Sequence, residues 1–165
     1  MERLIYRKTG FLLFTSLASA SSLAAQNSTT FNVSIIIQAN CTIAATNLTF
    51  PPQGVLSAAV ASTSTLTVTC TNTTPYTVGL SAGTGTGNTE TSRRMFGAVN
   101  TTASVGYQLF KADLTTNWGD ATVAARVSGT GTGAAQTLTV NGSVPAQATP
   151  APDTYSSIVT ATVYF

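Results

Sequence analysis

The chain has 165 residues, of which 43% are hydrophobic and only 7% are charged. It contains no histidine, which excludes a histidine-dependent catalytic triad. The formal net charge of +2 belongs to an N-terminal leader, and without that leader the chain is formally neutral. A neutral chain lacks the basic stripe that nucleic-acid binding needs, so we expect no nucleic-acid partner.

Residues 1–24 have the features of a secretion signal. An apolar stretch begins at Phe11, after a positive head formed by Arg3, Arg7 and Lys8. Small residues at Ser22 and Ala24 occupy the two positions that a signal peptidase reads, so we expect cleavage after Ala24, or after Ala25 as second choice. The apolar run is about 14 residues, short of the roughly 20 that span a bilayer, which predicts a removed leader without membrane insertion.

Residues 30–39 alternate between apolar side chains and mostly small or polar ones. Because side chains alternate across a strand, this pattern predicts a strand with one strongly apolar face. Such a strand at the start of a secreted chain can pair within its own domain, or it can complete the sheet of another molecule. The apolar positions are Phe31, Val33, Ile35, Ile37 and Ala39.

The rest of the chain reads as short strands separated by turn signals. Thr is the most abundant residue, and β-branched residues suit pleated, half-buried surfaces. We therefore predict an all-β sandwich. The expected strands are Cys41–Ile43 with a continuation through Asn47–Phe50, Ser64–Cys70, Tyr76–Leu80, Ser104–Phe110, Gln136–Val140 and Ile158–Phe165, with loops around Trp118–Asp120 and Pro145–Pro152.

The last predicted strand is apolar on one face to its final residue. Val159, Ala161, Val163 and Phe165 are in phase, and no later segment covers the far edge of this strand. Because a buried strand edge must be paired, we expect a segment from elsewhere to complete it.

Cys41 and Cys70 are the two cysteines of a chain that we expect in an oxidising compartment, which predicts one disulfide. Closing a loop of about 30 residues stabilises the fold by roughly 3–4 kcal/mol on the chain-entropy account. A metal site is not expected, because there is no histidine and no further thiol to complete it.

Several other motifs predict structure rather than chemistry. The repeated glycines of 83–87 and 129–133 are not followed by the Gly-Lys-Ser/Thr of a phosphate loop, so we predict turns. Arg93 and Arg94 are interpreted as a solvated rim beside a strand. Asp113 and Asp120 are the only acids near each other in sequence, and nothing favours a catalytic carboxylate pair. We expect no enzyme and no cofactor.

In order and spacing, these segments resemble the spore coat protein U domain, the subunit type of archaic (Csu-like) chaperone–usher pili. The resemblance covers essentially the whole mature chain. It rests on the alternating leader into Cys41-Thr42-Ile43, Arg94-Met95, Gly106–Phe110 followed by Trp118-Gly119, Leu138–Ala146, and Asp153-Thr154-Tyr155 leading into Val159–Phe165. The Pro145–Pro152 loop is richer in Ala and Pro than the family pattern.

The resemblance implies an incomplete immunoglobulin-like sandwich that lacks its last strand and is completed by a donor strand. It implies three parts: the signal (1–24), a donor-strand extension (25–40) and a pilin domain (41–165). The donor residues would be Phe31, Val33, Ile35, Ile37 and Ala39. One edge of the acceptor groove would carry Val159, Ala161, Val163 and Phe165, and the strand after Cys41 would supply the other.

The function implied is a structural pilus subunit that polymerises by donor-strand exchange and supports attachment and biofilm formation. The implied partners are a periplasmic pilus chaperone, an outer-membrane usher and neighbouring subunits, with export through the periplasm to a pilus on the cell surface. Two alternatives stay open. One is a self-complemented secreted binding module, for which Trp118 and Tyr107 would form a stacking platform. The other is a spore or cell-surface coat protein.

Overall fold

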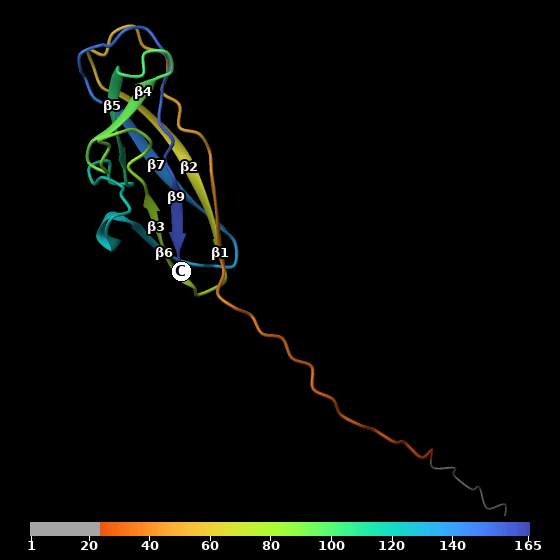
Figure 1. Cartoon of the computed structure of the whole chain (residues 1–165). Coiled ribbons are helices and arrows are strands. Elements are labelled where there is room, and N and C mark those ends of the chain that lie inside the picture. The colour runs from red at the N-terminus through yellow and green to blue at the C-terminus, as the bar shows by residue number, and fades with distance from the viewer. Residues whose placement is uncertain (1–23) are drawn as a thin grey trace, which may run out of the picture. The chain divides into compact units, whose positions relative to one another are not determined.

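The structure, a computed structural model, describes residues 24–165 (Figure 1). The predicted leader therefore lies outside the described residues, apart from Ala24. The chain divides into two units between Ile35 and Ile36, and each is described by itself. In the first unit, residues 24–35 form no helix or strand, and all the described strands belong to the second unit.

Two antiparallel sheets form the second unit. The larger sheet has six strands in the order β1-β2-β7-β5-β4-β8, and the smaller has three in the order β6-β3-β9. Among the described residues, the only helical element is a short 3-10 turn, η1 (Val123–Ala125). In chain order the strands are β1 (Cys41–Ala45), β2 (Val60–Cys70), β3 (Pro75–Leu80), β4 (Arg93–Gly97), β5 (Ser104–Phe110), β6 (Val127–Thr130), β7 (Ala135–Val144), β8 (Tyr155–Ser156) and β9 (Ala161–Tyr164).

A single apolar core contains side chains from both sheets. Alternate residues of β2 and β5 are buried, Tyr76, Val78 and Leu80 of β3 are buried as well, and Val68 and Val78 are fully enclosed. Trp118, from the loop after β5, is 1% exposed and donates its indole N–H to the carbonyl oxygen of Val78 at 2.8 Å. The alternation that predicted strands is therefore the alternation that builds the core. The all-β prediction is confirmed.

One strand has the predicted bounds, and two others are longer than predicted. β5 begins and ends where the pattern predicts. β2 begins at Val60 rather than Ser64, and β7 continues to Val144 rather than Val140. These extra residues pair with one another, Val60 opposite Val144 and Ser62 opposite Gly142. Small and polar residues hide the apolar alternation there, so only the pairing reveals the strand.

Several of the shorter strands were not predicted from the sequence. β4, β6 and β8 were not predicted, β1 ends at Ala45, and β9 covers only Ala161–Tyr164 of the predicted Ile158–Phe165. β8 has two residues and exists because Gly97 and Phe96 of β4 lie opposite it. Edge elements of this length depend on a neighbouring strand rather than on a periodic pattern of their own.

The first glycine repeat is a turn as predicted. Gly83, Gly85 and Gly87 lie between β3 and β4 with positive φ angles of 84°, 125° and 79°. Other residues rarely adopt this left-handed region. The second repeat begins inside a strand, because Gly129 belongs to β6, and only its later part is a loop.

Arg93 and Arg94 were expected to form a solvated rim. This prediction is wrong for Arg93, which is buried at 1% exposure, whereas Arg94 is exposed. The Arg93 guanidinium donates hydrogen bonds to carbonyl oxygens, which compensate for its burial. The acceptors are Ser81 and Leu80 after and within β3, Glu90 at 2.7 Å and Trp118 at 2.8 Å.

Candidate functional site

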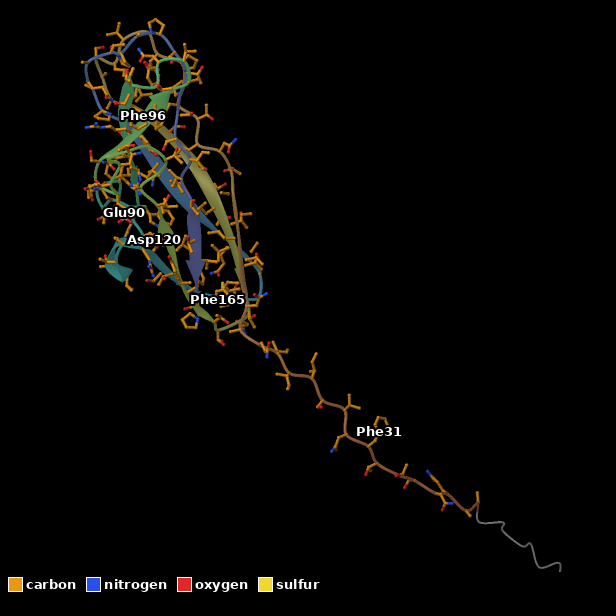
Figure 2. All side chains as sticks on the ribbon, in the orientation of Figure 1. Phe31, Glu90, Phe96, Asp120 and Phe165 are labelled. Atoms are coloured by element: carbon orange, nitrogen blue, oxygen red, sulfur yellow. A yellow bond between two sulfur atoms is a disulfide. The ribbon has the colours of Figure 1, made fainter. Side chains whose placement is uncertain are left out.

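The segment predicted as a donor strand has no strand partner and is exposed. Residues 24–40 form no strand. The side chain of Phe31 projects freely from the chain (Figure 2) and is 84% exposed. Val33 and Ile35 are each 85% exposed and Ile37 is 75% exposed, while Ala39 is also exposed. Ile36, on the opposite face, is equally exposed. A run of this kind can bury large apolar area against another surface.

β1 has one unpaired edge. It ends the six-stranded sheet and pairs only with β2, in a register that places Cys41 opposite Cys70. Just outside β1, Asn40 and Thr46 direct backbone groups toward the β2 side: Thr71 N donates to Asn40 O, and Thr46 N donates to Thr65 O. Backbone groups alternate between the two edges of a strand. Those of Cys41, Ile43 and Ala45 therefore point to the unpaired edge.

β9 has an unpaired edge of the same kind. It ends the three-stranded sheet and pairs only with β3. The preceding segment, Ile158–Thr160, continues along the same neighbour: Ser81 N donates to Thr160 O and Thr84 N donates to Ile158 O, both at 3.0 Å. By the same alternation, the backbone groups of Ala161 and Val163 point away from β3.

The two unpaired edges lie close together, since β1 and β9 are in contact although neither is hydrogen-bonded to the other as a strand (Figure 1). Half-buried apolar side chains pack against the core from both edges: Cys41 and Ile43 from β1, and Val159, Ala161 and Val163 from β9 and the segment before it. The same residues thus present inward side chains and free backbone groups, which is what an added strand needs.

Phe165 differs from the other three predicted edge residues. Val159, Ala161 and Val163 are half-buried, whereas Phe165 is 59% exposed at the end of β9 (Figure 2). Phe165 lies beyond the last pair of the β3–β9 ladder, which joins Thr77 to Tyr164. It therefore lacks a neighbouring strand to cover it.

A polar cluster anchors the outward face of β9. Tyr164 donates its hydroxyl proton to an oxygen of the Asp120 carboxylate at 3.0 Å, and the Arg126 guanidinium lies 3.7 Å from the centre of the Tyr164 ring. Arg126 also forms a 2.8 Å ion pair with Asp120. Gly79 makes room for Asp120, because a Cβ there would lie 2.0 Å from the carboxylate oxygen. Sequence reasoning missed this cluster because Tyr164 lies 44 residues along the chain from Asp120.

An apolar cavity of about 310 Å³ is lined in part by the chain segments that follow β1 and precede β9. Phe50 follows β1, Tyr155 precedes β9, and both line the cavity. The loop at residues 149–153 forms another part of its wall. The further apolar lining comes from Leu56, Val60, Met95, Val105 and Val144.

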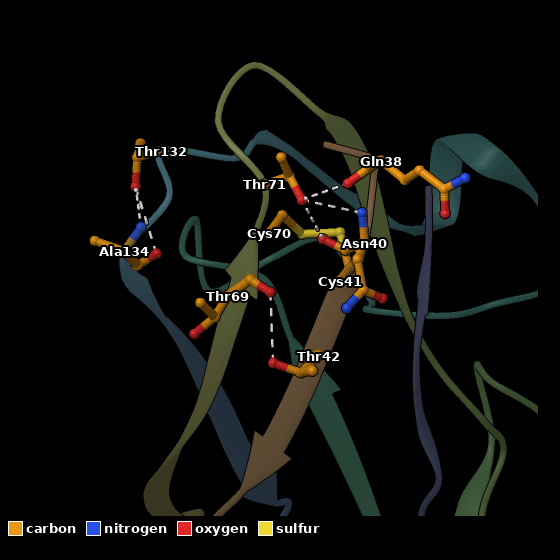
Figure 3. Close-up of a disulfide and its surroundings, with 9 residues drawn as sticks. All are labelled: Gln38, Asn40, Cys41, Thr42, Thr69, Cys70, Thr71, Thr132 and Ala134. Atoms are coloured by element: carbon orange, nitrogen blue, oxygen red, sulfur yellow. Dashed lines mark hydrogen bonds between the residues drawn. A yellow bond between two sulfur atoms is a disulfide. The ribbon is translucent and has the colours of Figure 1, made fainter. Parts of the chain in front are cut away.

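The predicted disulfide is present. Cys41 and Cys70 are bonded across the β1–β2 ladder (Figure 3), and Cys70 is 1% exposed. The bond fixes the start of β1 to the end of β2, at the point where the exposed segment joins the sandwich.

The charged side chains hold loops in place and do not gather into a reactive group. Hydrogen bonds from Thr116 and Thr115 lower the pKa of Asp113 to about 2. Hydrogen bonds from the Asn100 and Val99 backbone lower the pKa of Asp153. Burial lowers the pKa of Arg93. Among residues 24–165, no group of three or more Cys, Asp or Glu side chains is arranged to hold a metal, and no helix is long and apolar enough to cross a membrane.

The stacking platform suggested for a binding module is absent. Trp118 is 1% exposed and Tyr107 is 5% exposed, so both rings belong to the core. An aromatic ring stacks on a ligand only if its face is accessible. Trp118 lies in a polar loop, and this position favoured an exposed side chain. The indole instead points inward toward Val78, which the residues adjacent in sequence do not indicate.

A sequence model of the Spore Coat Protein U domain matches residues 27–162. The chain belongs to this family. The match includes most of the exposed segment and nearly the whole sandwich, so the resemblance seen in the motifs is confirmed. Membership of the spore coat protein U family classes the chain with non-enzymatic structural proteins, as the sequence predicted.

Two solved structures are similar to this chain. A chain in the crystal structure of the CsuC–CsuE chaperone–tip adhesion subunit pre-assembly complex, from archaic chaperone-usher Csu pili of Acinetobacter baumannii, has a TM-score of 0.58 and 22% identity, covering 78% of this chain and 40% of that one. A chaperone–tip adhesin complex of CFA/I fimbriae biogenesis has a TM-score of 0.40 and 11% identity, covering 75% of this chain and 41% of that one. No curated protein matches the chain significantly.

The first of these likenesses establishes the shared fold. The spore coat protein U domain of this chain is an all-β sandwich whose two end strands, β1 and β9, leave neighbouring edges unpaired. The predicted fold class, an immunoglobulin-like sandwich that is one strand short, is confirmed. Val159, Ala161 and Val163 lie along one of these two edges and pack against the core.

Proposed function

We propose that this chain is a structural subunit of a surface pilus and polymerises by donor-strand exchange. Residues 25–40 form the donor extension and residues 41–165 form the acceptor domain. The extension of one copy enters between β1 and β9 of the next, directing Phe31, Val33, Ile35, Ile37 and Ala39 toward the core. Before assembly, a periplasmic chaperone occupies the same place, and an outer-membrane usher exchanges one strand for the other.

One observation carries this proposal: the chain has both an exposed apolar segment and a pair of adjacent unpaired strand edges. Burying four large apolar side chains contributes roughly 6–12 kcal/mol before ordering costs. Main-chain hydrogen bonds to both edges add to this and fix the register. The interface joins two different surfaces, so it does not close and instead propagates into a fibre.

The experiment compares the mature protein purified with and without residues 26–40. We expect the full chain to form heat-stable ladders or fibres by gel electrophoresis and electron microscopy, and the truncated chain to stay monomeric. Two monomers that differ only in stability would contradict the proposal and favour a self-contained binding module. Flat arrays instead of fibres would favour a coat protein.

A pair of point variants separates the two faces of the segment. Ile35→Asp directs a carboxylate into an apolar groove, where an unpaired charge is costly, so the polymer yield should fall by about tenfold or more. Ser34→Asp adds the same charge one residue earlier, on the opposite face, and should polymerise like the wild type. Equal polymer yields from the two variants would show that the donor face is assigned wrongly.

A further inference from the structure

We infer that Thr71 favours donation of the extension to a second copy over its insertion beside the chain's own β1. It does so by fixing the course of Gln38–Asn40 where they join the sandwich. The inference rests on the proposed donor-strand function and names a residue that sets its outcome. Thr71 neither donates nor accepts the strand and acts as a positioning residue.

Thr71 holds the residues before β1 with hydrogen bonds from both its backbone and its side chain (Figure 3). Its backbone N–H donates to Asn40 O at 2.9 Å. Its hydroxyl accepts from Asn40 N at 3.1 Å and donates to Gln38 O at 3.1 Å, with Asn40 O as a second acceptor at 3.3 Å. Residues 38–40 therefore continue the course of β1 alongside the residue that follows β2.

Thr71 is itself held firmly. It directly follows Cys70, which is bonded to Cys41. Thr74 N donates to Thr71 O at 3.1 Å and closes a turn. Two further bonds join this turn to the loop after β6: Thr73 N donates to Gly131 O, and Gly131 N donates to Thr74 O. The contact with this loop is close, because a Cβ on Gly131 would lie 2.3 Å from Thr71 O. The backbone that carries the Thr71 side chain is thus held by the disulfide on one side and by the turn on the other.

Insertion beside the chain's own β1 would require a sharp reversal. The segment would have to run antiparallel to β1 and turn at Ala39–Asn40, immediately before Cys41. Two-residue hairpin turns favour positive φ at one or both central residues, which suits Asn and Gly but not Ala. A parallel insertion would need a crossover of a dozen or more residues, and only Asn40 separates the segment from β1.

The same reversal would break the bonds to Thr71, because the groups of Gln38 and Asn40 that bond to it would turn away. A strand arriving from another copy requires no such turn in the receiving molecule. The Thr71 contacts and the short connection therefore both oppose self-insertion, and they leave the groove free for a second copy of this chain.

Thr71→Val tests the inference, because it removes the hydroxyl and keeps the side-chain shape. The matched control is Thr69→Val, two residues earlier in β2, whose hydroxyl does not bond to residues 38–40. Ala39→Gly combined with Thr71→Val also relieves the turn. Thr71→Ser keeps the hydroxyl and should behave like the wild type, which separates loss of the hydrogen bonds from a general disturbance of the site.

Each variant is refolded with the disulfide intact, and its monomer is isolated by size-exclusion chromatography. Proteinase K is the probe, since residues 30–39 contain no Lys or Arg for trypsin, and mass spectrometry follows cleavage of this segment. We expect the protected fraction to rise about tenfold in Thr71→Val, as for loss of roughly 1.4 kcal/mol, and further in the double variant. The control should match the wild type.

The inference is overturned if the segment is cleaved equally fast in wild type, Thr71→Val and the double variant. Protection is measured on the monomer, so this readout tests Thr71 even if the wild type forms no polymer. Failure of the proposed function appears separately, as identical behaviour of the full and truncated chains. A wild-type polymer with no change in protection among the variants would reject the role of Thr71 alone.

Discussion

Among the described residues, Arg93 is the charged side chain that the core encloses, at 1% exposure. Its guanidinium joins three separate parts of the chain: the end of β3, the stretch before β4, and the loop that carries Trp118. No carboxylate forms an ion pair with it there; backbone carbonyl oxygens take all five of its short contacts. Arg93 therefore donates hydrogen bonds to several parts of the chain at once inside the sandwich.

Replacing this arginine should destabilise the fold strongly. Arg93→Met leaves several buried carbonyl oxygens without donors, and we expect a loss of about 3 kcal/mol or more in the free energy of unfolding. Equilibrium urea unfolding measures it. Arg94→Met, at the exposed neighbouring position, is the matched control and should stay within about 0.5 kcal/mol of the wild type. Similar losses in both variants would contradict the role assigned to Arg93.

At the scale of the strand, β9 is held from one edge and from its outward face. β3 supplies the ladder, while the cluster of Tyr164, Asp120 and Arg126 covers the outward face near the C-terminus. A strand with a free second edge opens easily unless other contacts hold it. The cluster therefore keeps the edge of β9 in shape while nothing is paired with it.

Substitutions at Tyr164 should loosen β9 in graded steps. Tyr164→Phe removes the hydrogen bond to Asp120 and keeps the ring over Arg126. We therefore expect the free energy of opening β9 to fall by about 1 kcal/mol. Tyr164→Ala removes both contacts and should lose more. Hydrogen exchange of the backbone amides of residues 161–164 measures the effect, with the amides of β5 as an internal reference. Equal exchange in β9 for all three proteins would show that the cluster does not hold the strand.

At the scale of the whole molecule, the proposed donor and acceptor are different surfaces of one chain. A variant defective only in its donor should still accept a strand, and so it should occupy a fibre end without allowing growth beyond it. This property distinguishes head-to-tail growth from a symmetric association, in which a defective copy would simply be left out.

Mixing the Ile35→Asp chain with the wild type should therefore shorten fibres as its fraction rises. Fibre lengths measured by electron microscopy at a constant wild-type concentration test this. Ser34→Asp, added in the same amounts, should join the fibres and leave their lengths unchanged. Unaltered lengths with Ile35→Asp would mean that its groove does not accept the donor strand of a wild-type copy at the fibre end, which contradicts the head-to-tail arrangement.

Prediction from the sequence succeeded where the local pattern was strong. The alternation in Ser104–Phe110 gave the bounds of β5, and the two cysteines gave the disulfide. It failed where neighbours in space decide, as for the burial of Arg93 and Trp118 and the short strands β4, β6 and β8. A side chain's exposure depends on what packs over it, and residues near it in sequence do not give that information.

The candidate site divides in the same way. The apolar face of residues 31–39 and the phase of Val159, Ala161 and Val163 follow from a period of two, which the sequence alone determines. The closeness of β1 and β9, the anchoring of Tyr164 and the hold of Thr71 on Asn40 were decided only by the tertiary structure. Each joins residues distant in the chain, and such contacts arise only once the sheets have formed and brought those residues together.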